Sequence, residues 1–397
     1  MPDSPVPLIG ILFAQFAAYH VDRCEAVARR LSGRARVLAV EVATTSQVYA
    51  WEPSGDVAGA AKVTLFPGQS YDSLPRLARL RAQWRALRKC DWVLVGIGYN
   101  EPDVIALSWL LRLSGVKGVM LTESKADDFP RSAGTELAKS LILRAYAAAI
   151  VGGARQAAYV RSLGFARRTV LPGYDGVSLE RIRAQGGGVL APDGAAFEDR
   201  PFIYVGRFVA KKNLIELIEG YARYRELAGP AARRLVLAGS GPEEAAMRAR
   251  IDLLGLGDAI EFPGFLTAEQ VSGRLAGALA LVLVSREEQW GLVVNEALAF
   301  GLPAIVSIPV GSRDALVRNL VNGYLVECGS TEGIAAAMQA LAADRAAWQA
   351  MVAASHERAW LGDTERLADA VELLLDPQAE PARTRAEHFK TATGTWN

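Results

Sequence analysis

Short apolar runs alternate with longer helical patterns along most of the chain, and this alternation most restricts its possible folds. The runs lack polar alternation, which is typical of strands buried on both faces of a parallel sheet. Two series of such strands predict two doubly wound α/β domains in tandem, with ligands expected beyond the carboxyl ends of the strands. The first series is Leu8–Phe13, Val37–Val42, Trp92–Gly96, Gly118–Thr122 and Ala148–Val151, and the second is Phe202–Val205, Arg234–Ala238, Ala259–Phe262, Leu279–Val284 and Ala304–Ser307.

The segment 184–201 is rich in Gly, Ala and Pro, which predicts an irregular linker between domains. It separates a first domain at 1–183 from a second domain at 202–358. Residues 359–376 are expected to form a helix that crosses back to the first domain. Residues 377–397 are polar and aperiodic, which predicts a frayed or disordered tail.

The composition excludes several classes of protein. The 397 residues suit two or three domains, and 51% hydrophobic with 22% charged residues is ordinary for a globular protein. The net charge of +1 argues against a dedicated DNA-binding protein, so no nucleic-acid partner is expected. Three cysteines and three histidines favour a reducing cytoplasm and predict no metal site. No signal peptide or membrane span is visible, so we expect a cytoplasmic protein.

The segment 285–307, SREEQWGLVVNEALAFGLPAIVS, carries the strongest functional pattern. A helical pattern begins near Gly291, directly after an apolar strand. The start of such a helix presents unpaired amide groups and the positive end of its dipole, which suit a phosphate. Glu288 precedes this helix and Glu296 lies inside it. These carboxylates are suited to sugar hydroxyls rather than to phosphate, or they are only solvated residues at a helix start.

Two other strand-to-helix turns carry candidate residues. Arg207, Lys211 and Lys212 gather after the first strand of the second series. A guanidinium fork together with an ammonium group can neutralise a diphosphate, although a solvated basic loop is the alternative. Gly239 and Gly241 follow the next strand and permit a ligand to approach the backbone closely. Alone they are a weak signal, because such a turn needs glycines anyway.

The order and spacing of these patterns together resemble the retaining GT-B glycosyltransferases of family 4, the group 1 glycosyltransferases. The family patterns G-R-x-x-x-x-K, G-x-G-P, F-x-G-F, E-x7-E, A-x-A-x-G-x-P and N-G-x-L-V match Gly206–Lys212, Gly239–Pro242, Phe262–Phe265, Glu288–Glu296, Ala297–Pro303 and Asn322–Val326. The match is strong over 200–330. The chain departs from the family at Gln289-Trp290, where Gly-Phe is more common, and at Asp314, where glutamate is usual. The resemblance implies a GT-B fold, two Rossmann-like domains with a cleft between them.

The resemblance also implies a role for each matched residue. Arg207 and Lys212 would stabilise the leaving diphosphate, and Glu288 would contact the donor sugar, so these three are the expected catalytic residues. Because two cations and a helix dipole supply the positive charge, no metal and no cofactor is expected. Glu296 would bind the ribose hydroxyls. The full set of expected donor-binding residues is Gly206, Gly239, Gly241, Phe265, Gly291, Leu292, Val293 and Glu296.

The acceptor site is less clear from the first domain. Family members often show a Gly-Gly turn after the first strand, where this chain has AQFAAYH. His20, in this segment, is expected to contact the acceptor or a donor phosphate, with packing or surface exposure as the alternative. Glu123, Asp127 and Arg131 follow a strand at its carboxyl end, in a segment similar to a T-E-S motif found in a subset of these transferases. We expect all four residues to bind the acceptor.

The segment Arg76–Lys89 carries six positive charges and no negative one, with Leu77, Leu80, Trp84 and Leu87 at helical spacing. This pattern predicts a basic amphipathic helix on an anionic membrane, or an ordinary docked helix with a solvated basic face. Residues 1–185 have a net charge of +8 and the remaining residues −7, which favours a membrane-proximal acceptor. A peripheral position at the inner face of the plasma membrane is therefore one hypothesis.

We therefore expect a retaining glycosyltransferase. It would move a sugar from a nucleotide diphosphate sugar to a sugar or lipid-linked saccharide acceptor, in polysaccharide or glycoconjugate assembly. The alternatives are a nucleotide-sugar 2-epimerase or a glycogen-phosphorylase-like relative of the same fold, and a nucleotide-sugar-binding protein without turnover. An epimerase would need more acid and base groups than this histidine-poor chain displays.

Overall fold

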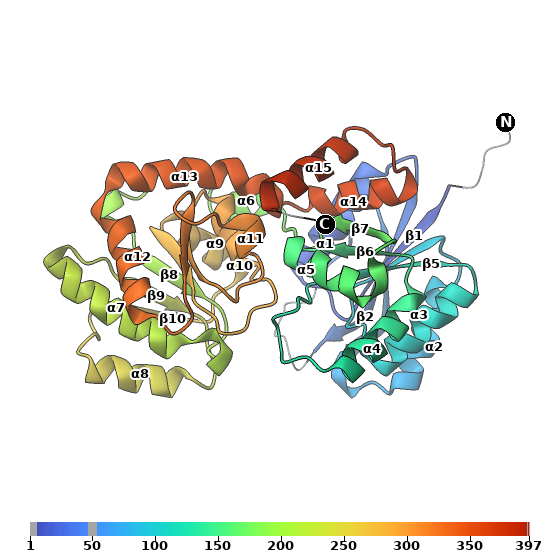
Figure 1. The fold of residues 1–397 in the computed structure, drawn as a ribbon, viewed down its shortest axis with the longest axis horizontal. Coiled ribbons are helices and arrows are strands. Elements are labelled where there is room, and N and C mark those ends of the chain that lie inside the picture. Colours follow the sequence, from blue (N-terminus) through green and yellow to red (C-terminus); the bar gives the residue numbers. More distant parts are fainter. Residues whose placement is uncertain (1–5, 47–53, 395, 397) are drawn as a thin grey trace. The chain divides into compact units, whose positions relative to one another are not determined.

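The computed structural model describes residues 6–46, 54–394 and 396 of the chain, which forms two compact units (Figure 1). Unit 1 comprises Met1–Val177 and Thr364–Asn397, and unit 2 comprises Ser178–Asp363. Each unit is built on one parallel sheet with helices, which confirms the predicted pair of doubly wound domains.

The sheet of unit 1 has seven strands in the order β3-β2-β1-β4-β5-β6-β7, and every neighbouring pair is parallel. Its central strands are almost completely buried, as the unbroken apolar runs predicted. The strands are β1 (Leu8–Phe13), β2 (Arg36–Thr45), β3 (Ala61–Ser70), β4 (Trp92–Val95), β5 (Lys117–Thr122), β6 (Ala148–Val151) and β7 (Thr169–Pro172).

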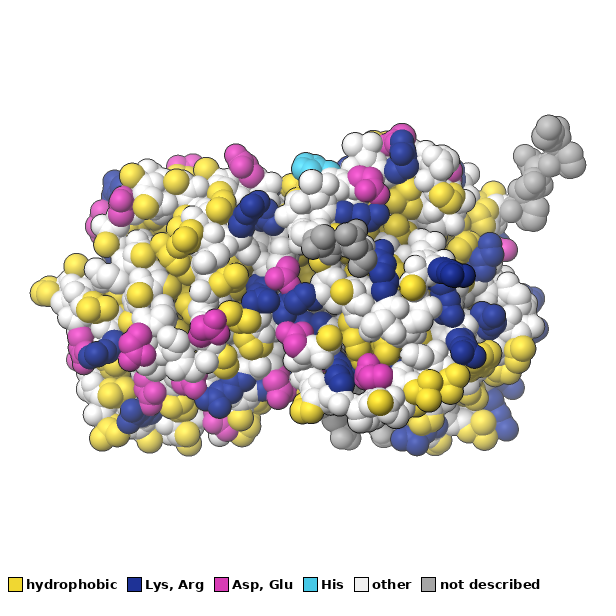
Figure 2. All heavy atoms as spheres, in the orientation of Figure 1, with side chains coloured by type: hydrophobic (Ala, Val, Ile, Leu, Met, Phe, Trp, Pro, Cys, Tyr) yellow, Lys and Arg dark blue, Asp and Glu magenta, His cyan; other side chains and the backbone are white. Residues whose placement is uncertain are grey.

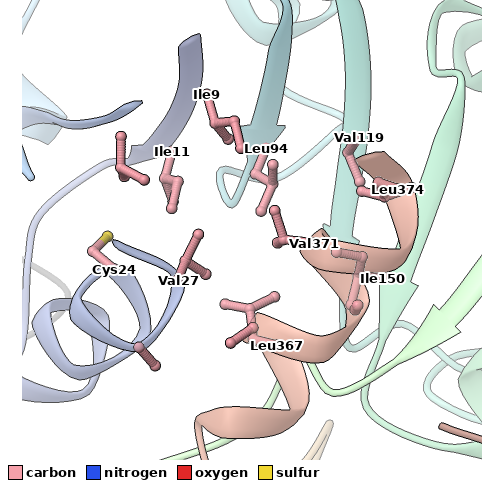
Figure 3. Packing of buried hydrophobic residues seen from close by; sticks show 14 of the residues in the cluster. Ile9, Ile11, Cys24, Val27, Leu94, Val119, Ile150, Leu367, Val371 and Leu374 are labelled. Carbon is pink, nitrogen blue, oxygen red and sulfur yellow. The ribbon is translucent and has the colours of Figure 1, made fainter. Parts of the chain in front are cut away.

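Helices cover both faces of this sheet (Figure 1). The hydrophobic core beneath α1 and α14 is shown in Figure 3, where Leu367 and Val371 of α14 face Val27 of α1 and the apolar side chains of the sheet. Burying one such side chain contributes about 1.5–3 kcal/mol. The helices of unit 1 are α1 (Ala18–Arg30), α2 (Arg76–Leu87), α3 (Pro102–Leu113), α4 (Ala133–Ile142), α5 (Ala154–Val160), α14 (Glu365–Leu375) and α15 (Ala382–Thr393).

The sheet of unit 2 has six parallel strands in the order β10-β9-β8-β11-β12-β13. The strands are β8 (Phe202–Val205), β9 (Leu235–Ala238), β10 (Ile260–Gly264), β11 (Ala280–Leu283), β12 (Ala304–Ser307) and β13 (Gly323–Val326). The helices are α6 (Leu179–Gln185), α7 (Leu214–Ala228), α8 (Glu244–Leu253), α9 (Ala268–Ala276), α10 (Val293–Ala299), α11 (Arg313–Leu316), α12 (Thr331–Ala343) and α13 (Arg345–Ala359).

The boundary between the units differs from the predicted linker. It lies between Val177 and Ser178, so 184–201 belongs to unit 2. Within that segment Arg200 is fully buried and donates hydrogen bonds to the carbonyl oxygens of Ala276 and Ala278, at 3.2 and 3.0 Å. A composition rich in Gly and Pro predicted an irregular path, but it could not show that one buried arginine fixes this path to the domain.

The carboxyl-terminal segment also differs from the prediction, because residues 382–393 form α15 rather than a disordered tail. Ala382, Ala386 and Phe389 are buried at helical spacing, and α15 packs against α14. Two of these three side chains are only methyl groups. A small apolar face of this kind is easily missed in a polar sequence.

Three strands lacked a clear signal in the sequence. The edge strand β3 is half-exposed and contains Pro67 and Gly68, which are typical of edges rather than of sheet centres. The strands β7 and β13 have only four residues each. Position in the sheet, rather than local composition, makes these segments strands.

Candidate functional site

The candidate site in unit 2 lies at the carboxyl ends of β8 and β11. These two strands are neighbours, and the chain turns to opposite sides of the sheet from them, to β9 after β8 and to β12 after β11. Such a switch point leaves a crevice at the strand ends, where doubly wound sheets bind ligands. The two loops are joined by a hydrogen bond of 2.8 Å from the amide of Arg286 to the carbonyl oxygen of Lys211.

An ion pair between Lys212 Nζ and Glu288 Oε2 occupies this site. Both side chains are 14% exposed, so the pair is partly shielded from solvent. The Ser285 hydroxyl donates to the same carboxylate oxygen at 3.2 Å, and the hydroxyl of Ser307, on β12, donates to the carbonyl oxygen of Ser285 at 2.5 Å. The structure thus brings together two of the three predicted catalytic residues and positions them from two neighbouring strands.

Asn213 holds the backbone directly after Lys212. It adopts a left-handed conformation with φ of 61°, which asparagine tolerates better than most residues. Its side-chain amide donates to the carbonyl oxygen of Val284 at 3.2 Å, and its side-chain oxygen accepts from Arg286 Nε at 2.9 Å. Sequence reasoning missed Asn213 as a positioning residue, although an asparagine between a loop and a helix is a recognisable signal.

Backbone amides follow Glu288 in the same loop. Gly291 has φ of 94°, and a Cβ atom there would lie 2.8 Å from Leu283, so the turn requires glycine. Among the described residues, no hydrogen bond uses the amide N–H groups of Gly291, Leu292 or Val293. Consecutive unpaired amides form a concavity that binds anions. The helix α10 that follows has only seven residues, so these amides matter more than its dipole.

Glu296 lies within α10 and is partly buried. Burial raises the pKa of its carboxyl group to about 7, and the positive charge of Arg181 acts in the opposite direction. A carboxyl group with this pKa carries a proton for part of the time at neutral pH, so it can donate as well as accept a hydrogen bond. Its predicted contact with ribose hydroxyls stays a prediction.

The departure from the family at Gln289-Trp290 has a packing explanation. Trp290 is buried, and its indole Nε1 donates to the side-chain oxygen of Asn295 at 3.0 Å. The side-chain amide of Asn295 in turn donates to the carbonyl oxygen of Gly362 at 3.0 Å. The indole therefore stabilises the loop and α10 from inside unit 2.

The glycines after β9 are explained by contact with the loop after β8. A Cβ atom on Gly239 would lie 1.9 Å from the carbonyl oxygen of Gly206, and one on Gly241 would lie 2.4 Å from that of Phe208. The amide of Phe208 also donates to the carbonyl oxygen of Ser240 at 2.8 Å. These glycines are required for packing between two loops, and their predicted contact with the donor is not needed to explain them.

Arg207 and Phe265 are the exposed members of the set predicted in unit 2. Arg207 follows β8, and its carbonyl oxygen accepts from the buried Tyr204 hydroxyl at 3.0 Å, which fixes the backbone but leaves the guanidinium at the surface. Phe265 follows β10 and is 66% exposed. A large exposed aromatic side chain at the carboxyl edge of the sheet is available to a flat ligand.

His20 of unit 1 is buried, with 7% of its surface exposed. Its ring lies 4.1 Å from that of Phe13, and its Nδ1 accepts a hydrogen bond of 3.0 Å from the amide of Ala17. Burial, and to a lesser extent Arg23, holds the pKa of His20 well below its usual value, so the ring is neutral at neutral pH. Packing and capping of α1 explain this residue, and its predicted contact with a ligand stays untested.

A largely buried charged cluster, of which sequence reasoning predicted only Glu123, lies at the carboxyl edge of the same sheet. Asp175, after β7, interacts with the carboxyl group of Glu123, after β5. Burial and the neighbouring Glu123 charge raise the pKa of Asp175 well above its usual value, against the effect of Arg23. Arg23 is 3.7 Å from Asp175 and lies over the ring of Tyr174. No local pattern joins residues so far apart in sequence.

The loop after β5 is cross-linked by its own charges. Lys125 is buried and pairs with Asp128 at 2.6 Å. Asp127 pairs with Arg155 at 2.8 Å, and although burial works against it, the neighbouring cations lower the pKa of Asp127. Arg131 donates to the carbonyl oxygen of Ala126 at 3.1 Å. Asp127 and Arg131 thus stabilise the loop, while their predicted contact with an acceptor stays a prediction.

Neither a metal cluster nor a membrane span is found in the parts of the chain that the structure describes. No group of three or more His, Cys, Asp or Glu side chains there is arranged to hold a metal ion. None of the described helices is both long and apolar enough to cross a bilayer.

Comparison with solved structures shows the fold class. Sucrose-phosphate synthase from Thermosynechococcus elongatus superposes with a TM-score of 0.70 at 20% identity, covering 94% of this chain and 98% of that one. HepE of Anabaena, in complex with UDP and glucose, gives a TM-score of 0.67 at 17% identity, covering 94% and 100%. The fold is GT-B, the fold of these glycosyltransferases.

Sequence comparison identifies the family of one segment of the chain. Residues 193–358 match the family model described as glycosyl transferases group 1, and this segment belongs to that family. The N-acetyl-alpha-D-glucosaminyl L-malate synthase of Bacillus anthracis is 28% identical over 142 residues, 36% of each chain. The alpha-D-kanosaminyltransferase of Streptomyces kanamyceticus is 30% identical over 153 residues, 37% of this chain and 38% of that one. The matched part thus spans only about a third of these relatives.

Proposed function

We propose that this protein is a retaining glycosyltransferase whose unit 2 binds a nucleotide diphosphate sugar. The observation that carries the proposal is the Lys212–Glu288 ion pair, which lies next to the unpaired amides of Gly291–Val293 at the switch point of the sheet. The group 1 family match covers this site, and a solved structural relative was crystallised with UDP and glucose. The ammonium group of Lys212 and the loop amides can bind a diphosphate, and the carboxylate of Glu288 can accept a hydrogen bond from a sugar hydroxyl.

The Lys212–Glu288 ion pair links the binding of the donor's diphosphate to the binding of its sugar. Without a ligand, the Lys212 ammonium group is neutralised by Glu288. A bound diphosphate competes for this ammonium group, which releases the carboxylate to accept a hydrogen bond from a sugar hydroxyl. The Ser285 hydroxyl keeps the released carboxylate in place. Phosphate binding and sugar binding therefore reinforce each other at this site.

The transfer step follows from the same charges. The bond between the anomeric carbon and the diphosphate oxygen breaks, and negative charge grows on the diphosphate. Lys212, Arg207 and the loop amides stabilise this charge. The acceptor oxygen bonds to the anomeric carbon on the face that the diphosphate leaves, and its proton passes to the departing phosphate oxygen. This route retains the configuration and, in our proposal, needs no metal.

The acceptor is proposed to be a saccharide or a lipid-linked saccharide, bound by unit 1. The exposed part of Glu123, beside Asp175 at the carboxyl edge of the first sheet, is the predicted acceptor residue that the geometry favours most. A role in polysaccharide or glycoconjugate assembly would follow from such an acceptor, in the cytoplasm.

A thermal-shift screen with nucleotide diphosphate sugars tests the proposal. One donor should raise the melting temperature, because a ligand at a hundred times its Kd stabilises the folded state by about 2.7 kcal/mol. Incubation of that donor with a panel of saccharide acceptors, in the presence of a chelator, should then yield a product with the donor's anomeric configuration by NMR.

Other results of this experiment would contradict particular parts of the proposal. Inversion of configuration would contradict the retaining mechanism, and loss of transfer on chelation would contradict metal independence. Stabilisation by a donor without transfer to any acceptor would instead favour the binding protein. No stabilisation by any nucleotide sugar would contradict the donor site itself.

A further inference from the structure

Unit 1 carries a basic surface on α2 and α3 and at the amino ends of β4 and β5. Among the residues that the structure describes, the exposed cations on and just after α2, on α3 and near them form no ion pair, in contrast to several arginines of unit 2. We call this set the basic edge. Its members are Arg76, Arg81, Arg85, Arg88, Lys89, Arg112, Lys117 and Arg144.

The helix α2 is not oriented as its sequence pattern suggested. Its buried residues include Arg79, which pairs with Asp103 at 2.8 Å and Glu101 at 3.2 Å, whereas Leu77 is 56% exposed. The predicted apolar stripe is therefore not simply the face that docks on the protein. Leucine side chains remain at the surface among the cations.

Neighbouring elements extend this mixture of apolar and basic side chains. The helix α3 packs against α2 and exposes Leu113 to 79% and Leu110 to 38%. Figure 2 shows Lys and Arg side chains among hydrophobic ones over this part of unit 1, with few Asp or Glu in that view. Exposed leucines on the same helices as cations that lack a carboxylate partner suit a partner that is both apolar and anionic.

A pocket of about 430 Å³ opens at this edge, lined by residues before β4 and around the start of β5. Three of its side chains, Arg88, Lys89 and Lys117, are cationic. The one carboxylate that lines it belongs to Asp91, which accepts a hydrogen bond of 2.8 Å from the amide of Leu8. The pocket therefore has a net positive charge and the size to accept a phosphate headgroup.

A second group of cations lies close together beyond α3. Burial lowers the pKa of the Arg168 guanidinium, and the nearby positive charges of Arg112 and Arg144 lower it further. Two of these arginines bind backbone carbonyl groups rather than carboxylates, since Arg112 donates to the Arg144 carbonyl oxygen and Arg168 to that of Leu143, both at 2.8 Å. Their charges remain uncompensated and would attract an anion.

From these observations we infer that the basic edge, with Leu77, Leu110 and Leu113, docks on a lipid bilayer that contains anionic phospholipids. The cations contact the headgroups, the pocket receives one phosphate, and the leucines enter the interface. Nucleic acid would satisfy the cations but not the leucines, so the bilayer is the better match. The inference does not depend on the proposed function.

Flotation with lipid vesicles tests the inference. The full chain should float with vesicles of equal parts phosphatidylcholine and phosphatidylglycerol at low salt, but not with phosphatidylcholine alone, and high salt should weaken binding. The variant Arg81→Gln/Arg85→Gln/Arg88→Gln/Lys117→Gln should lose about fivefold in affinity for each charge removed. Leu113→Ser should lose roughly tenfold by removing an apolar contact.

A matched control removes the same charge from unit 2. Arg223→Gln/Arg248→Gln/Arg274→Gln/Arg345→Gln replaces four exposed arginines that pair with carboxylates, and it should float like the wild type. All substitutions are at exposed positions, and circular dichroism checks that each variant folds. The inference is wrong if the wild type does not float with the anionic vesicles, or if the control loses as much binding. It is equally wrong if Leu113→Ser binds normally, because a surface that recognises charge alone would fit a nucleic acid.

Discussion

The carboxyl edges of the two sheets use charge in opposite ways. In unit 2, Lys212 and Glu288 form a partly exposed pair beside amides that have no partner among the described residues. In unit 1, Arg23, Asp175 and Glu123 form a cluster of which Arg23 and Asp175 are buried. The same fold therefore carries a site suited to ligand binding at the carboxyl edge of the unit 2 sheet and a largely structural cluster at the carboxyl edge of the unit 1 sheet. The difference predicts that substitutions at the unit 2 edge change activity and that substitutions at the unit 1 edge change stability.

The largest expected effect is on stability, at Arg23 of unit 1. Arg23→Ala should lower the free energy of unfolding by about 3–5 kcal/mol, because it leaves the buried Asp175 and its neighbour Glu123 without a cation. Urea denaturation measures this loss. Arg29→Ala on the same helix is the control, since the Arg29 side chain is 67% exposed and its ion pair contributes no more than about 1 kcal/mol. Equal stability of the two variants would contradict a structural role for the cluster.

The corresponding effect in unit 2 is on turnover. Lys212→Ala and Arg207→Ala should each lower kcat by about 10²–10³, as is typical when a preorganised group that stabilises developing charge is removed. Melting temperatures should change little. Lys211→Ala is the matched control, because Lys211 is an exposed lysine. Its contact with the Arg286 amide is made by its backbone carbonyl oxygen and not by its side chain. Activity of Lys212→Ala equal to that of Lys211→Ala would show that the ion pair is only structural.

A third substitution separates packing from ligand binding in the unit 2 site. Gly239→Ala should destabilise the protein by about 3 kcal/mol, because its Cβ would lie 1.9 Å from the Gly206 carbonyl oxygen and φ is 143°. Gly257→Ala is the control, with nothing within 4 Å of its Cβ, and should change stability by less than about 0.5 kcal/mol. A stable Gly239→Ala variant with weakened donor binding would instead support a direct contact with the donor.

The smallest expected effect is the pH dependence caused by Glu296. Its folded-state pKa of about 7 lies above its value in the unfolded chain, so the protonated carboxyl group favours the folded state. This contribution is complete below the unfolded pKa and is lost as the pH rises through about 7. Glu296→Gln should therefore gain stability relative to wild type over that range, on the order of 2 kcal/mol after allowance for partial exposure. Parallel stability curves for the two proteins would contradict the raised pKa.

The two edges also differ in how far the sequence predicted them. The loops of unit 2 were predicted because each candidate follows its own strand directly, so the parallel topology brings Lys212 and Glu288 together. The cluster in unit 1 was missed because Arg23 and Asp175 are 152 positions apart in number, and neither segment carries a sign of the other. Likewise, the helical face of α15 was hidden by its small residues, and the orientation of α2 depends on acidic partners in another helix.

The most direct test of the account is a crystal structure of the protein with a nucleoside diphosphate bound. The account predicts phosphate oxygens within hydrogen-bond distance of the amides of Gly291–Val293 and of Lys212 Nζ, with the Lys212–Glu288 pair opened. A diphosphate bound away from the ends of β8 and β11, with that pair intact, would contradict it.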